Sequence, residues 1–281
     1  MEIKNKLGIA VSSCGNKALD EQGFLSMKEQ GIEAIEISLS SYDDFDYKKV
    51  KENADKHGIK LWSLHLPFMP FSEIDPSALD WKVKFDTLKK FREIIKKGSE
   101  IGIDKFIIHP SGEPIEDKYR EERMLSSMSS LYRLADLAAE EDSVICVENL
   151  PRSCLGRDSK EIKKLVSVNS KLKVCFDTNH LLKEDIGEFI KNVGNKIVTV
   201  HVSDYDFKDE CHWLPGEGDI DWQKLYGDLL TAGYSGMWLY EVGFKPGSDI
   251  DRRELNYKDF YNNAMEIFKG DKPTAIGKRK I

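Results

Sequence analysis

Short apolar segments alternate with longer amphipathic segments along the whole chain. Each apolar segment has the length of a strand, follows a glycine or a polar breaker and stops at a polar residue, which is the pattern of a buried strand bounded by turns. Eight such segments occur: the first spans residues 7–12, and the others end near Glu36 and at or near His65, His109, Glu148, Asp177, His201 and Glu241.

Amphipathic segments separate these strands. The clearest span residues 81–101 and 120–140, and residues 221–230 and 257–268 follow the same helical spacing. Strands that alternate with helices predict a parallel sheet with right-handed crossovers. No G-x-G-x-x-G turn follows the first strand, which disfavours a nucleotide-binding open sheet, whereas eight units in roughly 250 residues predict a (β/α)8 TIM barrel. We therefore expect an α/β protein with one barrel domain over residues 1–270 and a polar, basic, loosely ordered tail over residues 271–281.

The composition limits which partners the protein is expected to bind and in which cellular compartment it is expected to work. The chain has 281 residues, 42 Lys and Arg against 49 Asp and Glu, and a net charge of −7, which disfavours nucleic acid because proteins that bind phosphate backbones usually carry a basic face. The five cysteines form no C-x-x-C pair, so we expect free thiols and a cytoplasmic location. The N-terminal residues lack an apolar signal region, and no segment approaches the roughly 18 apolar residues of a membrane span. The five cysteines are Cys14, Cys146, Cys154, Cys175 and Cys211.

Histidines and carboxylates gather at the predicted strand ends. All strand ends of a barrel converge on one face, and grouped carboxylates repel one another unless a cation compensates them. Mixed His, Asp and Glu ligands suit Zn²⁺, Mn²⁺ or Co²⁺, so the sequence predicts a divalent metal site. A single polar residue at a strand end is usually only a cap, and Glu36 and Asp204 could simply hold a loop or orient a ligand. Five of the six histidines lie at or just beyond these ends: His65, His109, His180, His201 and His212.

Five short motifs make the chain resemble the xylose isomerase-like barrel superfamily. They are VEN at 147–149, FDTNH at 176–180, HVSD at 201–204, PGEGDIDW at 215–222 and YEV at 240–242. The resemblance covers about residues 7–245. Members of this superfamily include sugar and sugar-phosphate isomerases and epimerases, inositol-catabolism enzymes and the apurinic/apyrimidinic endonuclease. The ordered motifs are specific for the superfamily and not for a substrate.

The resemblance implies a role for each strand-end residue. Glu148, Asp177, His201 and Glu241 match the four ligands of one metal, and the counterparts of Glu148 and Glu241 move protons on opposite faces of the substrate in the epimerase branch. His180 resembles a substrate-binding histidine of that branch. We also expect His65, Trp213 and Glu36 at the substrate.

The endonuclease branch has further metal ligands that this chain matches. His65 and His109 match its two extra histidines, with the counterpart of Glu148 bridging two metals. The third-metal set matches His180, Glu210 and His212, although Glu210 stands where that branch has Asp. Three features disfavour the endonuclease branch. The glycine-rich loop that this branch has after the fifth strand is missing here. Residues 38–47 carry three aspartates, and residues 66–76 contain no Lys or Arg. Phosphate contacts dominate the affinity for DNA, so these loops disfavour a duplex.

The sequence thus predicts a divalent-metal-dependent isomerase or epimerase that acts on a small sugar or sugar phosphate. The two alternatives are a multinuclear zinc endonuclease or phosphodiesterase and a relative of the keto-inositol dehydratases. Arg152 and Arg157 could hold a phosphate or a carboxylate, although a solvated loop charge is the simpler interpretation. Asp219 or Asp221 is expected to cap the helix that starts near Trp222. Whether the protein is a homo-oligomer stays open.

Overall fold

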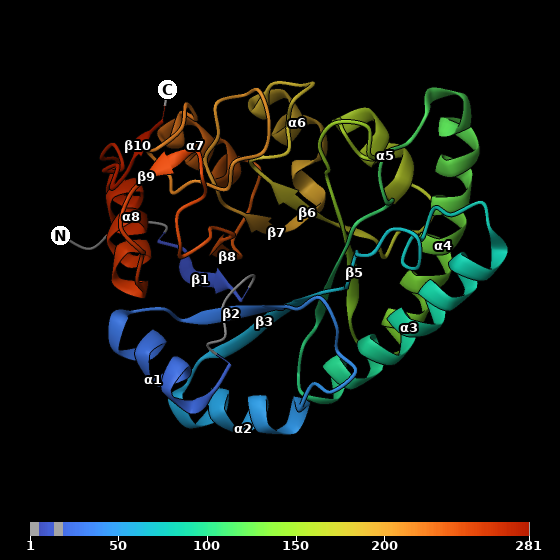
Figure 1. Cartoon of the computed structure of the whole chain (residues 1–281), viewed down its shortest axis with the longest axis horizontal. Coiled ribbons are helices and arrows are strands. Elements are labelled where there is room, and N and C mark those ends of the chain that lie inside the picture. The colour runs from blue at the N-terminus through green and yellow to red at the C-terminus, as the bar shows by residue number, and fades with distance from the viewer. Residues whose placement is uncertain (1–5, 14–18, 281) are drawn as a thin grey trace.

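Eight parallel strands form the centre of the molecule, and a helix follows each of them (Figure 1). The computed structural model describes residues 6–13 and 19–280. The strands are β1 (Gly8–Ser12), β2 (Ala34–Ser38), β3 (Lys60–His65), β4 (Lys105–Ile108), β5 (Val144–Glu148), β6 (Lys173–Asp177), β7 (Ile197–His201) and β8 (Met237–Tyr240). The helices are α1 (Glu21–Gln30), α2 (Tyr47–His57), α3 (Trp81–Glu100), α4 (Arg120–Glu140), α5 (Ser159–Val166), α6 (Ile186–Val193), α7 (Trp222–Thr231) and α8 (Tyr257–Lys269).

The sheet closes into a barrel. Its strand order runs β7-β6-β5-β4-β3-β2-β1-β8, and every pair is parallel. Just beyond β7, the N–H of Val202 donates to the carbonyl of Leu239 at 2.8 Å, and the N–H of Glu241 donates to the carbonyl of Val202 at 3.1 Å. These bonds join the last strand to the seventh. The predicted (β/α)8 barrel is confirmed.

Polar side chains cap the N-termini of most of the helices. Aspartate or asparagine side chains accept a hydrogen bond from the first turn of seven helices, which satisfies a backbone N–H that has no partner within the helix. Asp221 is the residue that caps α7, with its Oδ1 accepting from the N–H of Lys224 at 3.1 Å. Of the two caps considered from the sequence, the structure selects this one.

The barrel interior is packed with side chains. Trp62 on β3 donates its indole N–H to Thr199 on β7 at 3.0 Å, and these strands are not neighbours, so the bond crosses the inside of the ring. Ile107, Cys146 and Cys175 form a second small buried cluster. Burial raises the pKa of the Cys146 thiol to about 12, so this cysteine behaves as an inert apolar side chain. Cys14 lies outside the described residues.

The C-terminal segment differs from the loosely ordered tail expected from its polar sequence. Lys278–Arg279 (β10) pairs antiparallel with Ile250–Asp251 (β9). The N–H of Gly277 donates to Glu217 at 2.8 Å, and Arg279 forms an ion pair with Asp219. Carboxylates of the loop before α7 therefore hold the backbone of Gly277 and the side chain of Arg279. No helix in the described part of the chain is both long enough and apolar enough to cross a membrane.

Candidate metal and substrate site

Four strand ends bring the predicted metal ligands together. One ligand atom of each lies within 4.8 Å of the others, although the residues come from four different strands or the position just after one. Three of the side chains are almost completely buried, and that of Glu241 is 13% exposed. The four residues are Glu148, Asp177, His201 and Glu241.

His201 is oriented by a buried carboxylate behind it. Its Nδ1 lies 3.1 Å from Oε1 of Glu148 and 3.2 Å from Oε2 of Glu241. Its Nε2 lies 3.1 Å from Oε2 of Glu36, which also accepts from the hydroxyl of Ser63 at 2.7 Å. With a cation bound at Nδ1, which faces the site, Nε2 would carry the proton and donate to Glu36.

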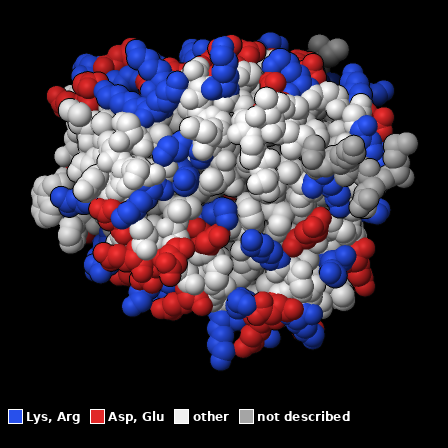
Figure 2. Space-filling model, turned by 180° about the vertical axis from the view of Figure 1, so that it is seen from behind, with Lys and Arg blue, Asp and Glu red and all other residues white. Residues whose placement is uncertain are grey.

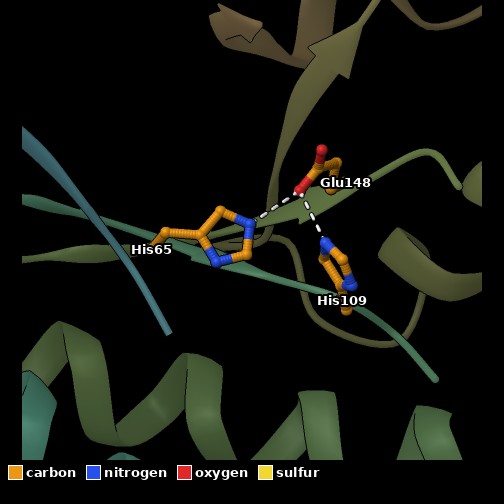
Figure 3. A group of neighbouring side chains, drawn as sticks. All are labelled: His65, His109 and Glu148. Carbon is orange, nitrogen blue, oxygen red and sulfur yellow. Dashed lines mark hydrogen bonds and ion pairs between the residues drawn. The ribbon is translucent and has the colours of Figure 1, made fainter. Parts of the chain in front are cut away.

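A second group shares Glu148 with the first. Figure 3 shows the rings of His65 and His109 both pointing at the Glu148 carboxylate. Their Nε2 atoms lie 3.1 Å and 3.3 Å from the same oxygen, Oε2. On the far side of its ring, His65 uses Nδ1 to contact the carbonyl of Leu66 at 2.8 Å. Glu148 therefore lies between two clusters and presents one oxygen to each.

The third group lies beside the first. Nδ1 of His180 contacts the carbonyl of Asn149 at 3.0 Å, and its Nε2 lies 3.4 Å from Glu210. Nδ1 of His212 contacts the carbonyl of Glu241 at 3.1 Å. In His65, His180 and His212, as in His201, one ring nitrogen meets an oxygen behind the ring and the other is left to face the site. This is how histidines that bind metals are held.

The first group has the charge and the free lone pair that a cation needs. Oδ2 of Asp177 is buried and has no hydrogen-bond partner among the described residues. Burial raises the pKa of Asp177 well above its ordinary value. Burial also raises the pKa of Glu148, but the neighbouring His201 and His109 outweigh it and hold that pKa well below its ordinary value. Three carboxylates and an imidazole in a dry site are a donor set that fits a divalent cation of the Zn²⁺ or Mn²⁺ type.

A cavity of 370 Å³ opens above these groups. Phe68 and Phe71 form an aromatic wall, and the ring of Phe68 stacks on His109 with centroids 4.3 Å apart. A volume of this size suits a small-molecule ligand. The polar residues that line the cavity are His109, Ser111, Glu113, Glu148, Arg152, His180, Glu210, His212 and Glu241.

Three of the residues predicted to contact substrate lie elsewhere. Trp213 points its indole N–H at Asp249, 2.8 Å away, and Arg279 stacks on its ring. Glu36 is completely buried behind His201, and His65 lies beneath the cavity wall. Of the four, only His180 lines the cavity.

Asp204 holds the loop before α7, the simpler of the two roles considered for it. Its carboxylate accepts from the N–H of Gly216 at 2.8 Å and from the indole N–H of Trp222 at 2.8 Å. A Cβ on Gly218 would lie 2.1 Å from this carboxylate, so only glycine fits there. The glycines of the PGEG turn therefore let the backbone of the turn lie close to the Asp204 carboxylate.

Two asparagines of the motifs position the ligands and were not singled out from the sequence. Asn149 donates to the carbonyl of Asp177 at 2.9 Å and accepts from its N–H at 2.8 Å. Asn179 accepts from the N–H of Cys211 at 3.0 Å. Their places beside Glu148 and Asp177 were a usable signal. Glu113 had none, because it lies well beyond the end of β4.

Comparison with known proteins agrees with this architecture. An inosose dehydratase from Geobacillus thermodenitrificans is 26% identical over 87% of this chain and 92% of its own. An uncharacterized protein from Methanocaldococcus jannaschii is 25% identical over 74% of each chain. The crystal structure of a D-tagatose 3-epimerase-like protein superposes with a TM-score of 0.76 at 21% identity, covering 94% of this chain and 99% of that one.

A match to a family model identifies the family of this chain. The model described as the xylose isomerase-like TIM barrel matches residues 24–259, which is most of the chain. The match spans the strands that carry every candidate ligand. The protein belongs to the xylose isomerase-like TIM barrel family.

Proposed function

We propose that this protein is a divalent-metal-dependent isomerase or epimerase of a ketose. The observation that carries the proposal is the placement of Glu148 and Glu241. Both carboxylates line the cavity, and both belong to the four-residue group that fits a cation. A group that moves protons must reach the reacting carbon, and these two carboxylates can.

Glu148, Asp177, His201 and Glu241 would hold the metal. When bound, Zn²⁺, Mn²⁺ or Co²⁺ would act as a Lewis acid toward the carbonyl and adjacent hydroxyl of the sugar. Glu36 positions His201 from behind, in place of the substrate contact expected from the sequence. Trp213 is held away from the cavity by its bond to Asp249 and is not part of the proposed mechanism.

The two glutamates carry out the proton transfers. One removes the proton from the carbon next to the carbonyl, and the electron pair of that C–H bond moves toward the carbonyl oxygen. Return of a proton to the same carbon from the opposite face inverts its configuration, which is epimerisation. Delivery to the former carbonyl carbon gives isomerisation, in which the hydroxyl of the deprotonated carbon gives up its proton to the former carbonyl oxygen and becomes the new carbonyl. His180 lines the same cavity and would bind a substrate hydroxyl.

The relatives support this chemistry. A structural neighbour is described as a D-tagatose 3-epimerase-like protein, and a curated relative is an inosose dehydratase. Removal of a proton next to a carbonyl is the step that such reactions would share. The proton-exchange experiment should therefore also include a keto-inositol as a substrate.

One observation favours a second candidate, a multinuclear zinc phosphodiesterase. His65 with His109, and His180 with His212, form two additional groups that could each hold a metal. Nucleic acid is a poor fit because Arg152 is the only Lys or Arg among the described residues that line the cavity, and carboxylates already pair with it. The face opposite the view of Figure 1 interleaves acidic and basic side chains and presents no uniformly basic surface (Figure 2).

The deciding experiment combines metal content with proton exchange. Elemental analysis of protein purified without added metal or chelator should give about one Mn, Co or Zn per chain. Incubation with a panel of ketoses in D2O should then place deuterium next to the carbonyl of the substrate. Two or three zinc ions per chain together with cleavage of abasic DNA would replace the isomerase proposal by the second candidate.

A further inference from the structure

Arg152 is enclosed by carboxylates at the mouth of the cavity. Its Nη2 donates to Glu113 at 2.7 Å and to Glu210 at 3.2 Å, and its Nη1 donates to Asp209 at 2.7 Å. Its Nε also donates to Glu113, at 3.3 Å. Each nitrogen of the guanidinium therefore already has a carboxylate partner.

The part of the chain that the structure describes offers the cavity no second arginine or lysine. Arg152 is the only Lys or Arg among the described residues that line the cavity. Arg157, the other arginine considered from the sequence as an anion contact, does not line it and lies 3.7 Å from Glu161. A phosphate entering the cavity would have to displace carboxylates from Arg152 before it found a cation.

The loop that carries Arg152 is built to keep this arrangement. Arg152 has a φ of 51°, a left-handed conformation that is disfavoured for a non-glycine residue. Arg120 anchors the loop by donating to the carbonyls of Ser153 and Cys154 at 2.9 and 2.8 Å. Strain of this kind persists only where surrounding contacts hold it, and it is common at ligand sites.

The mouth carries more negative than positive charge. Three carboxylates surround one guanidinium, and two of them, Glu113 and Glu210, line the cavity itself.

We propose that the cavity accepts ketoses whose end remote from the reacting carbons is uncharged or carries an ammonium group, and that it rejects sugar phosphates. The inference rests on the proposed ketose function and names the substrate class within it. A phosphate would meet carboxylates and an arginine that already pairs with three of them. An ammonium group could still bind the lone pairs of Glu113 and Glu210 that their bonds to Arg152 leave free. Like charges brought together at a binding site select against the wrong ligand.

Three sugars that differ only at carbon 6 test the proposal: D-fructose, D-fructose 6-phosphate and 6-amino-6-deoxy-D-fructose. Binding to the manganese-supplemented protein is measured by calorimetry, and proton exchange in D2O is measured separately. We expect the amino sugar to bind most tightly and the phosphate at least about tenfold more weakly than the amino sugar. Added salt should narrow this difference because the interactions lie near the surface.

Glu113→Gln is the informative variant, and Glu116→Gln is its matched control in the same loop. Glu116 is exposed, pairs with Lys118 and does not line the cavity. We expect Glu113→Gln to shrink the ratio of amino-sugar to phosphate affinity severalfold, and Glu116→Gln to leave it at the wild-type value.

The outcomes separate this inference from the proposed function. The expected order of binding without proton exchange would keep the charge selectivity and overturn the isomerase proposal for these sugars. Tightest binding of the phosphate, or equal binding of all three, would overturn the charge selectivity whatever the exchange result. Failure of all three to bind would also overturn it, since it requires a ketose at this cavity.

Discussion

Oε2 of Glu36 and Nε2 of His201 lie 3.1 Å apart, on the side of the imidazole that faces away from Glu148 and Glu241. Neither Glu36 nor His201 is exposed to solvent. This contact between β2 and β7 orients the ring so that, with a cation bound, Nε2 would carry the proton and the lone pair of Nδ1 would face the metal.

Removing the Glu36 carboxylate should weaken metal binding without removing a ligand. We expect Glu36→Ala to lower the affinity for Mn²⁺ about 10- to 100-fold, the usual effect of losing such a partner. Glu36→Gln keeps a hydrogen-bond acceptor, so its affinity for Mn²⁺ should lie between those of the wild type and Glu36→Ala. Competition with a fluorescent chelator measures the affinity, and equal affinities in all three proteins would show that Glu36 does not act through His201.

The assignment of proton transfer to Glu148 is tested by Glu148→Gln. An amide cannot accept the proton, so exchange at the substrate carbon should fall at least about 100-fold. Metal content must be measured in parallel at saturating Mn²⁺, because Glu148 is also a candidate ligand. Exchange at the wild-type rate in this variant would refute the assignment.

His109→Gln distinguishes one metal from several. His109 belongs to the group with His65 and Glu148 and not to the four-residue group. Under the proposed function, metal content should stay at about one per chain. Elemental analysis that shows the loss of one equivalent would instead favour the multinuclear candidate.

Gly218→Ala should destabilise the fold. Its Cβ would lie 2.1 Å from Oδ1 of Asp204 and 2.4 Å from the carbonyl of Tyr205, and overpacking of this kind costs about 1–3 kcal/mol. Gly227→Ala in α7 is the control, because nothing lies within 4 Å of its added Cβ, and it should stabilise by about 0.5–1 kcal/mol. Urea unfolding of both variants measures the free energies. Similar values for the two would contradict the close approach at Gly218.

Glu161 should contribute to stability in a pH-dependent way. Burial raises its pKa, but the hydrogen bonds and charge of Arg120 outweigh burial and lower it below 4.5. A lowered folded-state pKa means that the stabilisation is present above the unfolded value and is lost as the pH falls through the folded value. Glu161→Gln should therefore cost about 2 kcal/mol at pH 7 and progressively less below pH 4.5. A cost that does not change with pH would contradict the ion pair.

The barrel and its ligand positions could be predicted from the sequence because both depend on local order. Apolar segments of strand length alternate with amphipathic ones, and a parallel barrel brings every strand end to the same face. His65, His109, Glu148, Asp177 and His201 end or directly follow their strands, so their convergence followed once the barrel was inferred. The ordering of the C-terminal segment did not follow, because its partners Glu217 and Asp219 lie some 60 residues earlier.

The sequence by itself determined the barrel and which strand-end residues converge on one face, because strand alternation and strand ends are local properties. The tertiary structure decided what those side chains do there. It turned Trp213 toward Asp249, placed Glu36 behind His201, and paired Arg152 with Glu113 and Glu210, which lie 39 and 58 residues away. Long side chains on loops take their orientation from such distant contacts, and these contacts exist only in the folded chain.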